Sequence, residues 1–219
     1  MAKRADVPPD YREMIGLLRA GKVDALSDRV RRALAAGVPA EDVLNGALIP
    51  GMRELGEDFK RNRIYVPEVL IASRAMKEAM ALLEPALIGK ARVSRGTVVI
   101  GAVAGDLHDI GKNLVATLTR GAGFRVVDLG VDVSSDRFLE AVESEQADIA
   151  ALSCLLTTTL STMAETVGAL KEDGPDGLKV AIGGAPTTQQ FANEIGAHGY
   201  AENAGEAVDM FLRLMGDGA

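Results

Sequence analysis

The sequence predicts an N-terminal all-α four-helix bundle followed by an α/β domain, whose flavodoxin-like, doubly wound sheet has five parallel strands. Three observations support this fold class. The first 88 residues carry only helical periodicity, a basic stretch with glycines then interrupts it, and apolar strands alternate with helical stretches beyond residue 96. We therefore predict a helical-bundle domain at 1–88, a linker at 89–96 and a Rossmann-like domain at 97–219.

Four helical segments make up the predicted bundle. The first two, within 10–21 and 22–37, each end at a glycine, a common C-terminal cap. The third, 43–59, carries one apolar stripe, and Pro50 is expected to kink it. The fourth begins at Pro67, which suits the first turn of a helix. Its seam advances in steps of four and three, as in antiparallel bundles: Val69, Ser73, Met76, Met80, Leu83 and Leu87.

The second half of the chain alternates between two kinds of segment. Apolar strands are predicted at 97–103, 124–130, 148–155, 179–184 and 199–201. Helical stretches follow them near 110–121, 135–145, 160–173, 187–196 and 203–215. Near-continuous apolar strands, each followed by a helix, indicate a parallel sheet buried on both faces. We expect the strand order 2-1-3-4-5.

The composition narrows the class of protein. The net charge is −7 and no stripe of Lys or Arg stands out, so neither nucleic acid nor an anionic membrane is an expected partner. No apolar run approaches the roughly 20 residues that span a bilayer, and the N-terminus carries no pattern of a secretory signal. Cys154 is the single cysteine, which fits the reducing cytoplasm.

Polar and glycine residues follow three of the predicted strands. Gly105, Asp106 and His108 come after the first strand, Ser153 and the threonines 157–159 end the third, and the glycines 183–184 end the fourth. In the order 2-1-3-4-5 these loops are side by side at the carboxyl edge of the sheet, where ligands bind in such folds. The sequence therefore predicts a ligand site at this edge.

The stretch "GDLHDIGKN" at 105–113 holds one of the two histidines of the chain. It fails as a phosphate-binding loop of the Walker A type, because Asp106 stands where the first glycine belongs and Asn113 replaces the Ser or Thr. A zinc site rich in His and Cys is excluded by two histidines and one cysteine, and a His–carboxylate site has weak support. A general-base role of His108 stays open.

One further alternative needs only a single histidine. His108 can be the one protein ligand of a metal that a macrocycle already holds. Asp106, two residues earlier on an extended segment, points to the same side and can accept the other ring N–H, which fixes the tautomer. Gly111 would let a bulky group approach the backbone.

These residues resemble a known family. "DLHDIGKN" resembles the D-x-H-x-x-G signature of cobalamin-binding domains, "SCL" at 153–155 resembles their S-x-L, and "GG" at 183–184 their paired glycines. Together with the helical bundle, which is similar to the family's cap domain, the resemblance spans residues 10–215. It is to the corrinoid proteins of methyltransferase systems, which are related to the cobalamin-binding module of methionine synthase.

The resemblance implies roles for particular residues. His108 would bind cobalt from below in place of the cofactor's dimethylbenzimidazole base (base-off/His-on), and Asp106 and Thr159 would complete a proton relay with it. Ser153 would bond the benzimidazole nitrogen, and the glycines 183–184 would leave room for that ring. Further cofactor contacts are implied for Gly105, Leu107, Asp109, Ile110, Gly111, Leu155, Thr157, Gly183, Gly184, Ala185, Tyr200, Ala201 and, from the cap, Tyr65. Thr159 stands where a serine would be usual, and Tyr65 where the family often has phenylalanine.

The implied function is a methyl carrier that is not catalytic alone. Its cobalt would alternate between Co(I) and methyl-Co(III), shuttling a methyl group from a substrate:corrinoid methyltransferase to a corrinoid:acceptor methyltransferase of the tetrahydrofolate or thiol type. A reductive activator is a further expected partner, and the linker at 89–96 is the expected hinge of the cap. Alternatives are a cobalamin-dependent regulator or sensor, an adenosylcobalamin mutase small subunit, and a cofactor-free response-regulator-like sheet.

Overall fold

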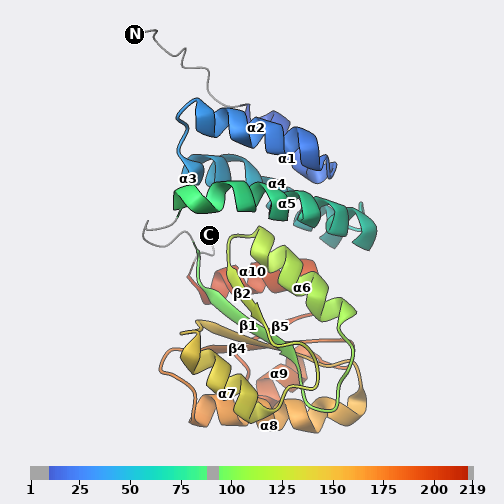
Figure 1. The fold of residues 1–219 in the computed structure, drawn as a ribbon. Coiled ribbons are helices and arrows are strands. Elements are labelled where there is room, and N and C mark those ends of the chain that lie inside the picture. The colour runs from blue at the N-terminus through green and yellow to red at the C-terminus, as the bar shows by residue number, and fades with distance from the viewer. Residues whose placement is uncertain (1–9, 88–93, 217–219) are drawn as a thin grey trace. The chain divides into compact units, whose positions relative to one another are not determined.

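The computed structural model describes residues 10–87 and 94–216, and it confirms the predicted fold class. The chain forms two compact units. Helices α1 to α5 build the first, and a five-stranded sheet with its helices, starting after Ser94, builds the second (Figure 1). Most of the predicted linker, residues 89–93, lies outside the described residues. No helix within 10–87 or 94–216 is long and apolar enough to cross a bilayer.

The helical unit contains the predicted helices in order. Their bounds are α1 (Tyr11–Arg19), α2 (Val23–Ala35), α3 (Ala40–Val43), η1 (Leu44–Leu48), α4 (Ile49–Lys60) and α5 (Val66–Leu87). The segments α3, η1 and α4 follow one another without a break as the third helix of the bundle, and η1 is a π-helical turn directly before Pro50. There the Ile49 N–H donates to the Leu44 carbonyl five residues earlier. The wider turn adjusts the backbone ahead of a proline that has no N–H to give.

The buried face of α5 is broader than the predicted seam. Val69, Met76 and Leu83 are buried as expected, but Ser73 and Met80 are only partly buried. Three alanines complete the face: Ala72, Ala75 and Ala79. Their small side chains let α5 approach α2, the helix with which it packs most extensively in this unit. α5 continues through Pro85 to Leu87, since a proline in the last turn of a helix removes few hydrogen bonds.

The α/β unit matches the predicted alternation of strands and helices to within two residues at each end. The strands are β1 (Thr97–Ala102), β2 (Arg125–Asp128), β3 (Ile149–Ser153), β4 (Lys179–Gly183) and β5 (Gly199–Ala201). The helices are α6 (Ile110–Gly121), α7 (Ser135–Ser144), α8 (Leu160–Glu172), α9 (Gln189–Ile195) and α10 (Ala204–Leu214), with the 3-10 turn η2 (Thr157–Thr159) before α8. All neighbouring strands are parallel, in the predicted order β2-β1-β3-β4-β5.

Helices cover both faces of this sheet. α7, α8 and α9 lie on one face, and α6 and α10 on the other (Figure 1). On the first face Phe138, Met163 and Ile182 belong to one buried apolar cluster. On the second, the ring of Phe124 packs edge-on against Phe211 of α10, with 6.4 Å between ring centroids. Burial on both faces explains why the strand sequences read as apolar runs.

Four strands end on a single row of paired residues. Ala102, Ser153, Gly183 and Ala201 are the last residues of β1, β3, β4 and β5, and each pairs with the next across the sheet. The loops that follow these strands therefore start side by side, as the sequence predicted. This edge carries the candidate site.

Candidate functional site

Asp106 is the centre of the site. Its side chain is completely buried and accepts hydrogen bonds from two loops. One oxygen, Oδ1, accepts from the backbone N–H of His108 at 2.9 Å and faces His108 Nδ1 at 2.8 Å. The other, Oδ2, accepts from the backbone N–H groups of Leu155 at 2.6 Å and Leu156 at 3.3 Å. One carboxylate thus joins the loop after β1 to the loop after β3.

These hydrogen bonds decide the charge of Asp106. Burial by itself would raise the pKa of the carboxyl, but the N–H groups of Leu155, His108 and Leu156 and the His108 ring outweigh it and lower the pKa to about 2. The carboxylate is therefore ionised near neutral pH and can only accept. It follows that Nδ1 of His108 carries a proton toward Asp106 and that Nε2 is the ring nitrogen left to face a ligand.

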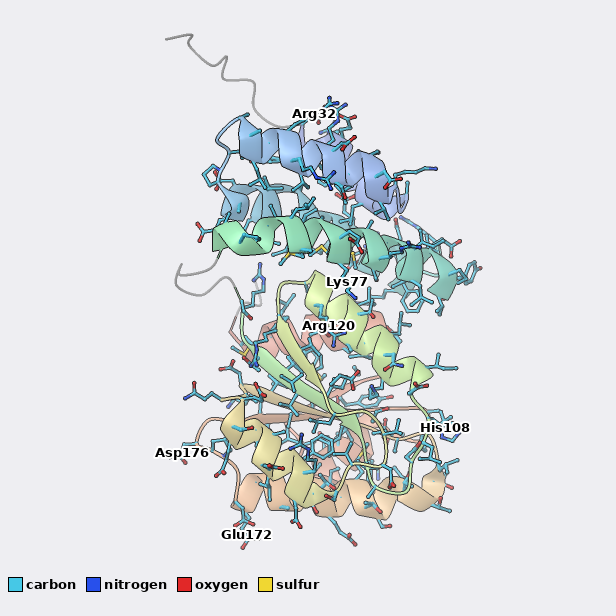
Figure 2. All side chains as sticks on the ribbon, viewed as in Figure 1. Arg32, Lys77, His108, Arg120, Glu172 and Asp176 are labelled. Carbon is cyan, nitrogen blue, oxygen red and sulfur yellow. The ribbon has the colours of Figure 1, made fainter. Side chains whose placement is uncertain are left out.

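The His108 imidazole is half-exposed, with 49% of its side-chain surface accessible. It lies at the edge of the α/β unit where the chain passes from β1 into α6 (Figure 2). Within the described residues, Nε2 has no hydrogen-bond partner. The site therefore offers one oriented ligand nitrogen.

Thr159 lies against the same carboxylate. Its buried hydroxyl is 3.3 Å from Asp106 Oδ2 and 2.9 Å from the carbonyl oxygen of Leu156. A hydroxyl has one proton to donate, and the shorter contact is to the carbonyl. The three members of the predicted relay are thus brought together, and the backbone N–H of Leu155 is the closer support of Asp106 Oδ2.

Four large apolar side chains lie near His108 in the chain or in the loop after β3. Leu107 and Ile110 flank it, and Leu155 and Leu156 follow β3; all four are exposed. The sequence reading included the first three and missed Leu156. Large apolar groups left in contact with water commonly mark a binding surface. They suit the flat edge of a macrocycle.

The glycines of the site meet different demands. Gly184 has a φ of +123°, and a Cβ there would lie 1.8 Å from the Cys154 carbonyl oxygen, so the backbone itself requires glycine. A Cβ on Gly183 would lie 3.2 Å from the Ala201 carbonyl oxygen. Gly111, in contrast, has open space where a side chain would project. The backbone conformation and the nearby Cys154 carbonyl therefore already require glycine at position 184, apart from any room that a ligand ring needs.

The other predicted site residues divide between the two units. Ser153 is partly buried at the end of β3, and its hydroxyl has no hydrogen-bond partner within the described residues. The remaining positions of the α/β unit are along the same edge, in loops, in η2 or in β5: Asp109, Thr157, Ala185, Tyr200 and Ala201. Tyr65 belongs to the helical unit, where it is exposed just before α5 and its N–H donates to the Glu68 carboxylate.

The donor set fits a metal that is already held by a macrocycle. Within 10–87 and 94–216, no three His, Cys, Asp or Glu side chains converge so as to hold a bare metal ion. One imidazole with its Nδ1 proton fixed can supply a single axial bond. The surrounding apolar side chains can contact the ring, and the hydroxyl of Ser153 can bond a nucleotide tail. Burial raises the pKa of the Cys154 thiol to about 11, so this cysteine is a protonated core residue.

Comparison with known proteins gives the family. Residues 96–209 match the model of the B12 binding domain, and residues 11–84 match a second model with the same description. The chain belongs to the B12-binding corrinoid proteins. A dimethylamine corrinoid protein of Methanosarcina acetivorans is 40% identical over 212 residues, 96% of this chain and 99% of the relative.

Two solved structures agree with this assignment. The methanol:cobalamin methyltransferase complex MtaBC of Methanosarcina barkeri matches with a TM-score of 0.85 and 30% identity, over 95% of this chain and 81% of that chain. A cobalamin-binding protein of Desulfitobacterium hafniense matches with a TM-score of 0.76 and 31% identity, over 94% of this chain and 98% of that one. The predicted family, fold and cobalamin cofactor are confirmed.

Sequence reasoning missed three residues of this corrinoid protein's site region. Lys112 of α6 is buried and bonds Asp128 at the end of β2, and Asp132 bonds the backbone of Gly105. Lys112 entered the sequence reading only within a failed phosphate loop. The available signal was the position of Asp128 and Asp132 after β2, which the order 2-1-3-4-5 places beside the loop after β1.

The geometry around Thr159 gives a first prediction. Thr159→Val removes the hydroxyl and keeps the shape of the side chain, so we expect a loss of about 1 kcal/mol in stability from the lost hydroxyl hydrogen bond, while the Leu156 carbonyl still accepts from the backbone N–H of residue 159. The Asp106–His108 contact should persist, because backbone N–H groups still hold Asp106. Cobalamin affinity and the visible spectrum of the bound cofactor report whether the Asp106–His108 contact persists, with Thr159→Ser as the control. A spectrum like that of a His108 variant would contradict it.

Proposed function

We propose that this corrinoid protein carries a methyl group between a substrate:corrinoid methyltransferase and a corrinoid:acceptor methyltransferase, with His108 as the lower axial ligand of cobalt. When bound, cobalamin supplies the cobalt that accepts and releases the methyl group. Membership of the corrinoid family supports the carrier role. The observation that carries the ligand assignment is the ionised, buried Asp106, which keeps a proton on Nδ1 of His108 and leaves Nε2 as the nitrogen that can face cobalt.

The chain's own residues would hold and tune the cofactor. Asp106 would orient the His108 ring and fix its tautomer, as carboxylate partners of metal-bound histidines do. Leu107, Ile110 and Leu155 would exclude water beneath the ring. Ser153 and the segment 183–185 would hold the nucleotide tail at the row where β3 and β4 end.

The helical unit would shield the upper face of the cofactor. Tyr65 is the residue we propose for this contact, because it leaves a large aromatic side chain exposed at the start of α5. Opening for each methyltransferase would take place at the linker, 89–96. A single buried free thiol, Cys154, supports a cytoplasmic location.

The partner would choose the methyl donor. The similar proteins include a dimethylamine corrinoid protein and a chain of a methanol:cobalamin methyltransferase complex. Chains similar to this one are thus named for different methyl donors. We therefore assign the substrate methyltransferase only as a class. The acceptor enzyme would be of the tetrahydrofolate or thiol type, and a reductive activator would restore the reduced cobalt.

The ligand assignment has a direct spectroscopic test. In the holo-protein reduced to cob(II)alamin, one axial nitrogen splits each electron paramagnetic resonance line into three, and labelling the protein's histidines with ¹⁵N should change three lines to two. We expect His108→Ala to lose this splitting and to shift the visible spectrum. His198→Ala is the matched control, because His198 is the other histidine of the chain and its Nδ1 accepts a hydrogen bond from the Val180 N–H.

Other outcomes would overturn the assignment. Wild-type splitting that ignores the ¹⁵N label would mean that the axial nitrogen comes from the cofactor's own base, and label-sensitive splitting that persists in His108→Ala would mean that His198 supplies it. The carrier role is tested separately. The methylated holo-protein, mixed with a thiol-type or tetrahydrofolate-type corrinoid:acceptor methyltransferase, should transfer about one methyl group per bound cobalamin. Failure with both types would contradict that role.

A further inference from the structure

The segment between β2 and α7 is bonded to the His108 loop on its N-terminal side. Asp132 makes two hydrogen bonds there: its Oδ1 accepts from the Gly105 N–H at 2.7 Å, and its own N–H donates to the Asp106 carbonyl at 3.0 Å. Just before it, the Gly130 carbonyl accepts from the Ala102 N–H at 3.0 Å. Asp132 thus holds the peptide that leads directly into Asp106.

The same segment is bonded to the chain on the C-terminal side of His108. Lys112 Nζ lies 2.6 and 2.7 Å from the two carboxylate oxygens of Asp128 and 2.7 Å from Asn113 Oδ1. Asp128 Oδ1 also accepts from the Gly130 N–H at 2.9 Å. The first turn of α6 and the loop after β1 are therefore both fastened to residues 128–132.

We propose that Asp132 is a positioning residue for the lower-ligand loop, acting with the Lys112–Asp128 pair to fix His108 from both sides. This inference rests on the proposed role of His108 as the axial ligand. Asp106 orients the His108 ring through the proton on Nδ1, but it can do so only if the backbone of Asp106 is itself held in place. Asp132 provides this through the peptides on either side of the Gly105–Asp106 bond.

The backbone of Asp132 suits this task. Its φ is +54°, in the left-handed region, where aspartate and asparagine are the best tolerated residues after glycine. Gly105, which it holds, has a φ of +84°. The hydrogen bond from Gly105 to Asp132 thus joins two residues of this region, and the bond from the Asp132 N–H to the Asp106 carbonyl follows directly, which keeps the loop in a conformation that ordinary chains rarely adopt. Asp132 is exposed, so its effect should be on local geometry rather than on overall stability.

Three substitutions separate the hydrogen bond from the backbone. Asp132→Asn keeps both the acceptor and the tolerance of positive φ. Asp132→Gly keeps the tolerance and removes the acceptor, and Asp132→Ala removes the acceptor without the added freedom of glycine. In the protein without cofactor, we expect the Gly105 amide to exchange with deuterium about tenfold faster in the Gly and Ala variants, and at the wild-type rate in Asn, since an exposed loop amide loses its partner.

The second readout is the coordination of cobalt. At saturating cob(II)alamin, the fraction of protein that shows the axial-nitrogen splitting should fall at least twofold in Asp132→Gly and Asp132→Ala and stay at the wild-type level in Asp132→Asn. A purely structural role would leave this fraction unchanged.

The outcomes are distinguishable. Unchanged splitting in Asp132→Gly, with or without faster Gly105 exchange, overturns the positioning role. A loss in Asp132→Asn as large as in Asp132→Gly also overturns it, since the acceptor is then not what matters. If wild-type protein shows no histidine splitting, the proposed function itself fails, whereas the Gly105 exchange rates still report whether Asp132 holds the loop.

Discussion

Asp106→Ala is expected to lower the free energy of unfolding of the α/β unit by about 3 kcal/mol, because it removes the acceptor of several partly buried donors, and a donor costs about 1–3 kcal/mol when it is buried and unpaired. Those donors are the backbone N–H groups of Leu155 and Leu156 and the His108 ring. The slowest-exchanging amides of β1 and β3 measure this free energy for the α/β unit alone. Bound cob(II)alamin should also lose most of its histidine splitting.

Asparagine at position 106 should restore little of this loss. Both carboxylate oxygens of Asp106 face only donors. In asparagine an NH₂ group replaces one oxygen, so a donor would face another donor there. We expect Asp106→Asn to lose cobalamin affinity nearly as strongly as Asp106→Ala. Glu143→Ala, which removes an exposed acid of α7, is the control and should change stability by no more than about 0.5 kcal/mol. Wild-type coordination in Asp106→Asn would contradict the need for a carboxylate.

The sequence was sufficient for the fold because its signals are local and repeated. Each strand of the α/β unit is an apolar run and each helix an amphipathic one, so period and length identify them without tertiary information. Five alternating strands and helices favour the flavodoxin-like order β2-β1-β3-β4-β5, and this order brings Asp106, Ser153 and Gly183 to one edge. His108 and Thr159 were found for the same reason.

The partners that hold these residues were harder to predict. The closest contact of Asp106 is the backbone N–H of Leu155, and any residue other than proline could supply that donor. Gly184 was expected to give a ligand room, but its positive φ and the nearby Cys154 carbonyl become visible only in three dimensions. The π turn before Pro50 likewise changes the backbone hydrogen-bond pattern, and no residue type in the sequence predicts that change.

Lys112 shows where the sequence reading stopped short. Its partner Asp128 is sixteen residues away and belongs to the neighbouring strand, so the pair depends on how α6 lies over β1 and β2. A lysine after Gly111 suggested a phosphate loop, and once that interpretation failed the residue had no assigned role. A buried ammonium needs compensation, and the place to look for it was the end of the adjacent strand.

Removing the charge of Asp128 should be the most destabilising single change in this network. The Lys112 side chain is 1% exposed, so Asp128→Asn leaves a buried ammonium without its counter-ion, and breaking such a pair typically costs about 3–5 kcal/mol. Asparagine keeps an oxygen for the Gly130 N–H, which confines the change to the charge. Lys112→Met should cost less, because Asp128 is 25% exposed and water can reach it.

The double variant decides whether the pair acts as a unit. Lys112→Met in the Asp128→Asn background removes the stranded ammonium, so we expect stability to recover by about half of the Asp128→Asn loss instead of falling further. Hydrogen exchange of the slowest β1 and β3 amides gives the four free energies of the cycle. Arg137→Met, which breaks the exposed Arg137–Glu140 pair, is the control and should cost at most about 0.5 kcal/mol. Additive losses in the cycle would mean that Lys112 and Asp128 stabilise the loop independently, and the two-sided fixation of His108 would then lack its C-terminal half.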